Sequence, residues 1–464
     1  MSKYFIKLSY IIIFILGFLL SRIIISNDIP VGQLVDFTGP TSSVGKPFGQ
    51  GHIDAIKWIN KNGGINNRKI RVDTVDYSYK APRAVATYKR WKSRLKVITV
   101  IGWGTADTEA LMETIARDKI PFFSGSYAGQ LTDPTGKAPN SFKAAPYNFF
   151  YGPSYSDACR GLLTWALKDW ESKGKSDKPK FVHMGDNHPY PNAPKQACRE
   201  YAQELGFEVL SVINYTLAPG DFTAQCLTLK QIEANYAYLA NSSNSTTALL
   251  KACNTVGAEV QFMTNVWGVD ETVIKASGKA ADGIVFAVRT SSVWGDDTEG
   301  MELIKNISSM SGKKDQYRSV HYISAVCSMF YIAEAMKLAM TEGELSGESI
   351  RNAMYKNENW APEELKGVCL PAMVSAVAGV VFGIVNGISS GIAFMGIKVF
   401  PAVILGGLDS VLGAILGGLV IGLLEHFAHY VDVQFLNIGN LIRIAPFYAL
   451  IIILMIKPYG FFWY

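Results

Sequence analysis

The side chains best suited to chemistry in this chain are hydroxyl, amide and aromatic groups that gather in five short loops. These loops span residues 102–105, 124–127, 185–190, 241–243 and 265–268. Backbone N–H groups and Ser or Thr hydroxyls bind a carboxylate at the start of a helix, while Tyr and Trp enclose an apolar side chain. A single hydroxyl such as that of Thr105 could simply cap a helix. Recurrence in successive loops nevertheless favours a binding site for a small zwitterion.

Catalysis and metal binding have little support in the sequence. The stretch Ser124-Gly125-Ser126-Tyr127-Ala128 lacks the second glycine of a Gly-x-Ser-x-Gly nucleophile elbow. His183 and His188 are five residues apart, but no carboxylate or cysteine completes a metal site. Six cysteines are widely spaced without a Cys-x-x-Cys pair, and the sequence leaves their disulfide pairing open. We therefore expect a protein that is not an enzyme and has no metal or cofactor.

The loops follow the strands of two successive patterns in which strands alternate with helices. The first pattern predicts strands over residues 29–37, 69–75, 96–101 and 120–123, a turn over 38–51, and helices over 53–60, 81–93 and 108–117. The second predicts strands over 181–184, 208–215, 237–240, 260–264 and 284–288, and helices over 193–205, 222–233 and 246–256. This alternation indicates parallel α/β sheets, whose ligands lie outside the carboxyl ends of the strands. Because Walker and Rossmann glycine spacings are absent, we expect two α/β lobes around a cleft.

Apolar residues are concentrated at the two ends of the chain. Of 464 residues, 49% are hydrophobic and only 18% are charged, against about 25% charged in ordinary soluble proteins. Residues 1–27 carry two lysines before an apolar run, which predicts a signal peptide or an uncleaved membrane anchor. Beyond Lys366 no charge appears before Lys398, and residues 367–464 predict about three membrane spans. The net charge of +5 is too mild to indicate a nucleic-acid partner.

The middle of the chain also resembles a known family. The matching motifs are Val31-Gly32-Gln33-Leu34, Phe37-Thr38-Gly39-Pro40, Gly63-Gly64-Ile65, Tyr77-Ser78, Phe142-Lys143, Tyr151-Gly152, Asp186 with Tyr190, and Gly220-Asp221-Phe222. They resemble the periplasmic branched-chain amino-acid-binding proteins of ABC transporters over residues 28–366. The resemblance implies a two-lobed, hinged Venus-flytrap fold, with lobe I over about 28–146 and 290–360 and lobe II over about 147–289.

The same resemblance implies roles for individual residues. Thr105 and Ala106 match the loop that holds the ligand carboxylate. Ser126 and Tyr127 match the loop whose backbone groups touch the carboxylate and the ammonium. Tyr190 matches the aromatic side chain that closes on the ligand, with Tyr151 or Tyr155 near another. Together with other loop residues, the candidate ligand site is Trp103, Thr105, Ala106, Ser124, Ser126, Tyr127, Tyr151, Asp186, Tyr190 and Trp267.

Two positions depart from the family pattern. Ala128 stands where the family has a threonine, and Pro219 stands where it has the acidic partner of the ligand ammonium. A buried ammonium without a carboxylate is costly. Asp186 or Asp270 would therefore have to substitute for the missing acid, or the ligand is not an ordinary α-amino acid.

The carboxyl-terminal part resembles a different family. Met395-Gly396-Ile397-Lys398, the glycine-rich stretch 405–418, Ala445-Pro446-Phe447 and Lys457-Pro458-Tyr459-Gly460 resemble the final part of branched-chain amino-acid permeases. The earlier helices of such a permease are missing. The two patterns meet near residues 368–371 without a linker, which indicates an in-frame fusion of neighbouring genes or an artefact of sequence assembly.

The functional expectation follows from both resemblances. We expect the solute-binding component of an ABC-type amino-acid uptake system, fused to a permease fragment. It would lie in the bacterial inner membrane with a large periplasmic domain. Since the chain has no ATP-binding P-loop, the expected partners are a separate ATP-binding subunit and permease subunits. The alternative is a membrane-anchored sensor for a small polar solute, without transport.

Overall fold

The computed structural model describes residues 28–138, 141, 143–312, 316–356, 360–370, 419–424 and 427–428. The chain divides into two compact units, Met1–Gly387 and Ile388–Tyr464. The predicted signal or anchor over residues 1–27 lies outside the described residues. So do the predicted membrane spans, apart from the short helical pieces 419–424 and 427–428 in the second unit.

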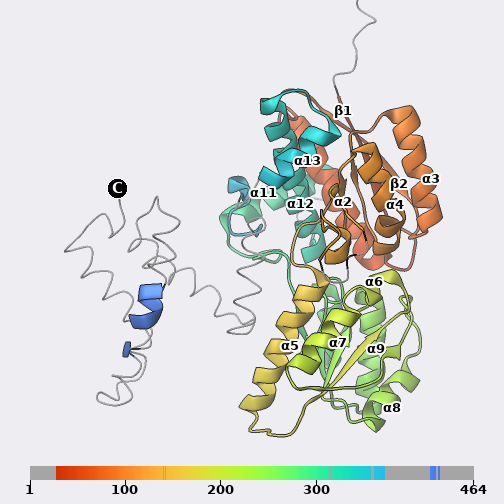
Figure 1. The fold of residues 1–464 in the computed structure, drawn as a ribbon, viewed down its shortest axis with the longest axis vertical. Helices are drawn as coiled ribbons and strands as arrows, with labels where there is room; N and C mark the ends of the chain where they lie inside the picture. Colours follow the sequence, from red (N-terminus) through yellow and green to blue (C-terminus); the bar gives the residue numbers. More distant parts are fainter. Residues whose placement is uncertain are drawn as a thin grey trace, which may run out of the picture. The chain divides into compact units, whose positions relative to one another are not determined.

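The first sheet of the first unit is parallel and has the strand order β2-β1-β3-β4-β5. Its strands are β1 Ile29–Val35, β2 Ile70–Asp76, β3 Thr99–Ile101, β4 Phe122–Phe123 and β5 Asn148–Phe149. In Figure 1 this sheet and the helices around it form the upper lobe, which we call lobe I.

Helices cover both faces of the lobe I sheet. They are α2 Ser42–Lys61, α3 Ala81–Arg90 with a π-helical turn Trp91–Leu95, α4 Thr105–Asp118, α11 Glu299–Ser308, α12 Val320–Glu342 and α13 Gly347–Lys356. Side chains of a strand alternate between the two faces. Accordingly Ile29 and Val31 pack with α2, α11 and α12, and Leu34 packs with α3 and α4 on the other face.

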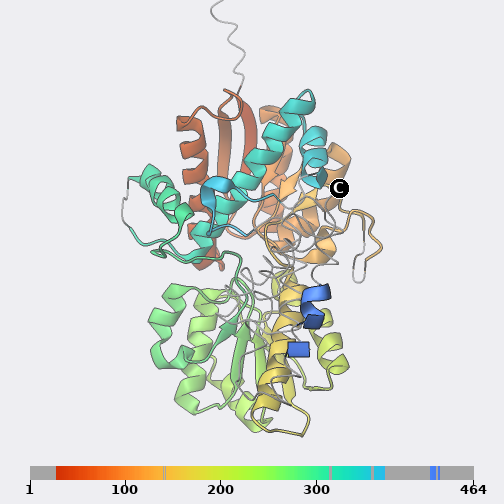
Figure 2. The ribbon, with the colours of Figure 1, turned by 90° about the vertical axis from the view of Figure 1, so that its left-hand side faces the viewer.

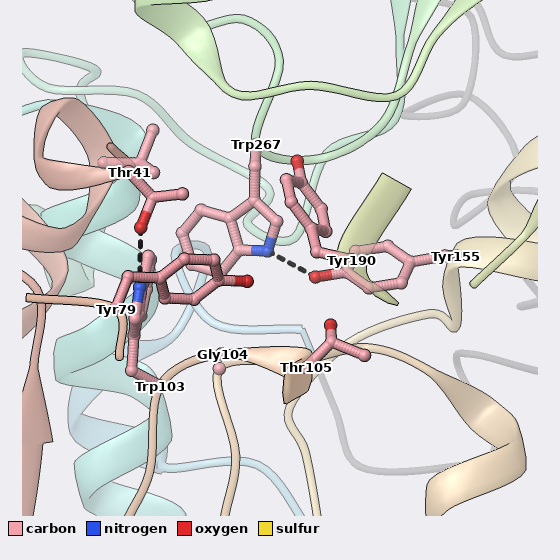
Figure 3. A pocket seen from close by; sticks show the side chains of 10 residues that line it. Thr41, Tyr79, Trp103, Gly104, Thr105, Tyr155, Tyr190 and Trp267 are labelled. Carbon is pink, nitrogen blue, oxygen red and sulfur yellow. Dashed lines mark hydrogen bonds between the residues drawn. The ribbon is translucent and has the colours of Figure 1, made fainter. Parts of the chain in front are cut away.

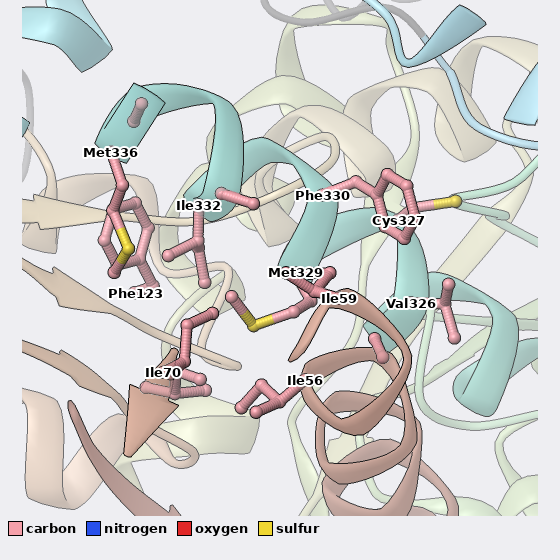
Figure 4. Packing of buried hydrophobic residues seen from close by; sticks show 14 of the residues in the cluster. Ile56, Ile59, Ile70, Phe123, Val326, Cys327, Met329, Phe330, Ile332 and Met336 are labelled. Carbon is pink, nitrogen blue, oxygen red and sulfur yellow. The ribbon is translucent and has the colours of Figure 1, made fainter. Parts of the chain in front are cut away.

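The lobe I core is built around α12. Figure 4 shows Met329, Ile332 and Met336 of this helix packed near Ile59 of α2 and Phe123 of β4. Among the described residues, α12 is the one helix that length and composition would allow to cross a membrane. Most of its side chains are buried within the protein, and burial on most sides explains why an apolar stripe is not visible in its sequence.

The second sheet is also parallel and has the order β11-β10-β9-β6-β7, with β8 paired to β6. Its strands are β6 Lys180–Gly185, β7 Glu208–Val209, β8 Ile213–Asn214, β9 Tyr236–Leu239, β10 Gln261–Thr264 and β11 Val285–Phe286. We call the sheet and its helices lobe II, which occupies the lower part of Figure 1.

Lobe II also has helices on both faces of its sheet, as Figure 2 shows. They are α5 Tyr155–Ser172, α6 Pro189–Asn192, α7 Lys195–Glu204, α8 Thr223–Gln231, α9 Ser243–Val256 and α10 Glu271–Ser277. Phe181 and Tyr238 pack on the α5 and α7 face, while Val182 and Leu239 pack on the α8 and α9 face. Short 3-10 turns occur at Gly129–Leu131, Gly278–Ala281, Ser309–Ser311 and Glu363–Leu365.

All six cysteines are paired. Cys159–Cys198 joins α5 to α7, and Cys226–Cys253 joins α8 to α9, so each of these disulfides links neighbouring helices on one face of lobe II. Cys327–Cys369 links α12 to the segment 365–370. That segment is held in lobe I by an antiparallel bridge between Cys369 and Thr290, next to the place where the chain returns from lobe II.

The predicted alternation of strands and helices and the parallel sheets are confirmed, but the predicted turn over 38–51 is wrong. Helix α2 begins at Ser42. Its glycines permit close approach rather than a turn. A Cβ atom on Gly45 would lie 2.3 Å from the Asp36 carbonyl oxygen, and one on Gly51 would lie 2.6 Å from the Tyr322 carbonyl oxygen. The predicted strand 208–215 is also split, into β7 and β8.

Candidate ligand-binding site

A small cavity is enclosed by residues of both lobes. Its lining is Thr41, Val44, Tyr79, Trp103, Gly104, Thr105, Gly125, Tyr155, Tyr190 and Trp267, and we call it the aromatic pocket. In Figure 3 the hydroxyls of Tyr79, Thr105 and Tyr155 point toward its centre. The free space is about 10 Å³, which is room for about one water molecule. Aromatic side chains therefore fill most of the space between the lobes.

The start of α4 forms one wall of the aromatic pocket. Gly104 is the N-cap, without a side-chain hydrogen bond, and Thr105 is the first helical residue. The Thr105 backbone N–H faces the Tyr79 hydroxyl and opposes the rise that burial causes in the pKa of Tyr79. Because Thr105 is not the N-cap, its hydroxyl is available for another partner, the Ser126 hydroxyl at 2.7 Å. The positive end of the helix dipole and two hydroxyls thus meet at this wall.

The predicted loops 102–105 and 124–127 come together here. Ser124 Oγ lies 2.7 Å from Thr108 Oγ1 and accepts the Ser126 backbone N–H at 2.9 Å. Ser124, Ser126, Ala106 and Tyr127 are not themselves among the lining residues. Ser124 and Ser126 instead support the start of α4 through hydroxyl contacts.

Two tryptophans face each other across the lobes. Trp103 and Trp267 have ring centroids 4.8 Å apart at an angle of 69°. The Trp103 indole N–H donates to Thr41 Oγ1 at 2.9 Å, and the Trp267 indole N–H donates to the Tyr155 hydroxyl at 2.9 Å. Both indoles are therefore fixed in orientation, and their polar edges are satisfied without a ligand.

One asparagine holds the lobe II side of the pocket. Asn265 Oδ1 accepts the Tyr190 hydroxyl at 3.0 Å and the Trp267 backbone N–H at 2.7 Å. Its amide nitrogen donates to the Ala240 carbonyl oxygen at 2.8 Å. The predicted loops 185–190 and 265–268 are thereby joined, and Tyr190 and Trp267 both line the pocket.

Tyr79 is a lining residue that the sequence pattern did not single out. Its φ of +57° and the φ of +53° at Ser78 are left-handed backbone conformations, which cost about 1–3 kcal/mol each outside glycine. Thr41, Val44, Gly104 and Gly125 complete the lining residues that were not proposed, while Tyr155, which the family resemblance offered as the alternative to Tyr151, does line the pocket. Thr41 and Tyr79 follow β1 and β2, so the rule that pointed to the loops after β3 and β4 could have found them.

Tyr151 and Asp186 lie outside the lining of the pocket. The Tyr151 hydroxyl accepts the Leu370 backbone N–H at 2.8 Å, and its ring is 5.1 Å from that of Tyr331. Asp186 accepts the Leu217 backbone N–H at 2.8 Å. Both side chains thus have structural partners in the described chain.

The two acids proposed to replace the missing ammonium partner, Asp186 and Asp270, both have other partners. Asp270 caps α10 by accepting the backbone N–H groups of Thr272 and Val273, and its second oxygen lies 3.4 Å from His321 Nε2. Pro219 is exposed. Neither Asp186 nor Asp270 lines the aromatic pocket.

A buried carboxyl group lies at the first turn of α4. Asp107 Oδ1 accepts the Tyr77 hydroxyl at 2.6 Å, whereas Oδ2 has no hydrogen-bond partner among the described residues. Desolvation by burial raises the pKa of Asp107 to about 7, against the hydrogen bond from Tyr77 and those from backbone N–H groups, which lower it. This carboxyl group can therefore change its protonation state near neutral pH.

A buried arginine stands against Trp267. The guanidinium carbon of Arg289 is 3.7 Å from the Trp267 ring centroid. Its Nη1 donates to the Tyr127 hydroxyl at 3.0 Å, and its Nη2 donates to His321 Nδ1 at 2.7 Å. Burial lowers the pKa of His321 to about 3, so this histidine is neutral at ordinary pH. The described residues contain no cluster of three or more His, Cys, Asp or Glu side chains suited to a metal.

Comparison with known proteins gives consistent matches. The family model for periplasmic binding proteins matches residues 28–371. The Leu/Ile/Val-binding protein homolog 1 of Brucella abortus is 22% identical over 308 residues, which cover 66% of this chain and 78% of that protein.

Two solved structures illustrate the likeness in fold. A branched chain amino acid ABC transporter protein from Thermus thermophilus with bound valine superposes with a TM-score of 0.65 and 21% identity, covering 74% of this chain and 86% of the other. A fatty acid ABC transporter substrate-binding protein from Thermomonospora curvata gives 0.64 and 17%, covering 74% and 83%.

Proposed function

This chain belongs to the periplasmic binding protein family, and we propose that it is the solute-binding component of an ABC-type uptake system. The observation that carries the proposal is the aromatic pocket, which takes its lining from both lobes. Because the free space is about 10 Å³, a ligand would enter only when the lobes part, and it would be enclosed among the aromatic side chains when they close again. No bond of the ligand needs to be broken, and we propose no enzymatic step.

Closure is supported by direct contacts between the lobes. Ser43 Oγ of α2 lies 3.0 Å from Ser243 Oγ of α9, and the Tyr79 and His188 rings are 5.1 Å apart. Phe48 of α2 packs edge-on against Trp267 at 5.1 Å. Together with the Trp103–Trp267 contact they hold the lobes together around the pocket, and a ligand that bridges the lobes would add to the stabilisation of the closed form.

The ligand we propose is a small organic carboxylate with an apolar body. Its carboxylate would take the backbone N–H and the hydroxyl of Thr105, which lines the pocket at the positive end of α4. Its body would lie among the aromatic rings. The names of the relatives support branched-chain amino acids as the first candidates.

The partners follow from the same proposal. The chain would act outside the cytoplasm and deliver its solute to permease subunits driven by a separate ATP-binding subunit. We keep the fusion to a permease fragment as part of the proposal. It is supported by the exposed apolar side chains of the described helical pieces of the second unit, Leu419, Leu423 and Phe427, which suit a lipid or apolar surrounding.

The test is a titration of the full-length chain in detergent, followed by tryptophan fluorescence, because Trp103 and Trp267 line the pocket. We expect a saturable change with a small carboxylate that disappears in Trp267→Phe and is kept in Trp170→Phe, whose indole binds Asp177 on lobe II away from the pocket. No saturable response to any small carboxylate would contradict the proposal. Solute uptake by vesicles that requires ATP would separate a transporter component from the alternative, a sensor.

A further inference from the structure

We infer that the preferred ligand of the aromatic pocket is an organic anion with a carboxylate but no ammonium group, and that Arg289 determines this preference through Trp267. The inference rests on the proposed function and specifies its ligand class. Its basis is the distribution of charge around the pocket, which differs from what a zwitterion requires.

Among the described residues, the lining of the pocket offers no carboxylate to receive an ammonium. None of its ten lining residues is an acid. Asp186 is used by the Leu217 backbone and Asp270 by the start of α10. A buried ammonium without a carboxylate is costly, so an α-amino acid would be penalised on this side.

A positive charge, by contrast, is fixed against one wall. Arg289 is 1% exposed and donates to two neutral groups, the Tyr127 hydroxyl and the His321 ring. Within the described part of the chain, its nearest link to an acid runs through His321 to Asp270. A buried cation of this kind is stabilised by any anion that approaches it, and a ligand carboxylate in the pocket is such an anion.

The same arginine disfavours a cationic ligand. Five aromatic rings without an acid are typical of a site for a quaternary ammonium. However, the guanidinium of Arg289 already lies 3.7 Å from the centre of the Trp267 ring, and 5.2 Å from that of Tyr127. A second cation on these rings would be repelled by the first. The aromatic lining therefore serves the apolar body of the ligand.

Asp107 is the rival counter-charge and needs a separate argument. It does not line the pocket, and it already accepts the Tyr77 hydroxyl and backbone N–H groups at the start of α4. Its pKa of about 7 means that it can take up a proton when an anion binds nearby. It is thus a small obstacle for a carboxylate, and because it lies outside the lining of the pocket an ammonium would not reach it directly.

The first experiment compares ligands that differ in one group, on the full-length chain by fluorescence titration. The probes are leucine, 4-methylpentanoate and 4-methylpentanamide, with phenylalanine, 3-phenylpropanoate and 3-phenylpropanamide as the aromatic series. In whichever series binds more tightly, we expect the affinity for the acid to be at least about tenfold higher than the affinity for the corresponding amino acid and for the corresponding amide.

The outcomes separate the two claims. If an amino acid binds more tightly than the corresponding acid that lacks the ammonium group, the proposed function holds and the inference is wrong. Asp107 would then be the group that receives the ligand ammonium. If the amide equals the acid, the pocket has no preference for an anion and the inference is also wrong. If none of the six compounds binds, both the inference and the carboxylate ligand of the proposed function are contradicted.

The second experiment tests Arg289 itself. In Arg289→Met we expect the affinity for the acid to fall at least about tenfold while the affinity for the amide stays within about twofold. The matched control is Arg318→Met, since Arg318 also stacks on a ring, that of Tyr322 at 4.7 Å, and does not line the pocket. A merely structural role would weaken acid and amide alike and would overturn the assignment.

A variant that keeps the positive charge distinguishes a loss of charge from a failure of the Arg289→Met protein to fold. Arg289→Lys retains a cation at the same place, so we expect it to keep the preference for the acid over the amide, whatever its thermal stability. Loss of that preference in a folded Arg289→Lys protein would show that the positive charge is not its source.

Discussion

The hydroxyl of Tyr79 faces the backbone N–H of Thr105, the first residue of α4, and this N–H opposes the rise that burial causes in the pKa of Tyr79. A carboxylate bound at this helix start would need the same N–H group. The tyrosine and the ligand therefore compete for one donor, and Tyr79 is held at this position by a backbone with positive φ.

Replacing Tyr79 by Phe should tighten the binding of a carboxylate ligand. The Thr105 N–H would face no hydroxyl in the unliganded protein and would gain an acceptor on binding, and leaving a buried donor without an acceptor costs about 1–3 kcal/mol. We expect an affinity higher by about two- to tenfold and a lower melting temperature, by titration and thermal denaturation. Tyr322→Phe removes a buried hydroxyl that donates to Asp54 and should lower only the melting temperature. Weaker binding in Tyr79→Phe would mean that the hydroxyl contacts the ligand itself.

The raised pKa of Asp107 predicts a pH dependence of stability. Burial moves this pKa from 3.8 to about 7, so the folded protein binds the proton more strongly than the unfolded chain does. The resulting stabilisation is complete below about pH 4 and is lost as the pH rises through about 7. Asp107→Asn lacks this titration.

The measurement is the melting temperature of both proteins between pH 4 and pH 8. We expect the melting temperature of the variant to rise relative to that of the wild type as the pH rises. The other groups, including the buried histidines, titrate alike in both proteins, so only the Asp107 titration should differ. A difference that stays constant with pH would show that the Asp107 pKa is not raised.

Asn265 should couple two pocket side chains. In Asn265→Ala, the Tyr190 hydroxyl and the Trp267 backbone N–H lose their shared acceptor, which should cost about 1–3 kcal/mol of stability and weaken ligand binding. Asn148→Ala is the matched control, since Asn148 is equally buried and donates to the Leu131 carbonyl at 2.7 Å outside the pocket. Equal affinities of the two variants would contradict a positioning role for Asn265.

The disulfide Cys327–Cys369 should stabilise lobe I in an oxidising compartment. In the double variant Cys327→Ala, Cys369→Ala we expect the free energy of unfolding to fall by about 2–5 kcal/mol, which would lower the melting temperature. A reducing agent should abolish this difference between the variant and the wild type. Peptide mapping by mass spectrometry should find the pairs 159–198, 226–253 and 327–369. Any other pairing in the native protein would contradict the structure.

The alternation of strands and helices could be predicted because it depends on local periodicity. The start of α2 could not, because Gly45 and Gly51 are explained by backbone atoms of Asp36 and Tyr322, and Tyr322 is remote in sequence. Helix α12 lacks an amphipathic pattern since it is buried on most sides. The disulfide pairs could not be predicted either, because they depend on which helices pack side by side, and local sequence patterns do not determine this.

The candidate site was predictable in part. Trp103, Thr105, Tyr190 and Trp267 were proposed from the loops that follow strands, and they line the pocket together. The same rule, applied after β1 and β2, would have added Thr41 and Tyr79. Arg289 could not be predicted as a site residue, because its position shortly after a strand is not distinctive. Its role depends on its packing against the Trp267 ring, which only the structure shows.

The way Cys369 is tied down has a mechanical consequence. The disulfide to α12 and the bridge to Thr290 fasten the segment before residue 370 to lobe I. A force that pulls on the chain after residue 370 would therefore act on lobe I through the disulfide and the bridge, and would reach lobe II only through the segments that connect the two lobes.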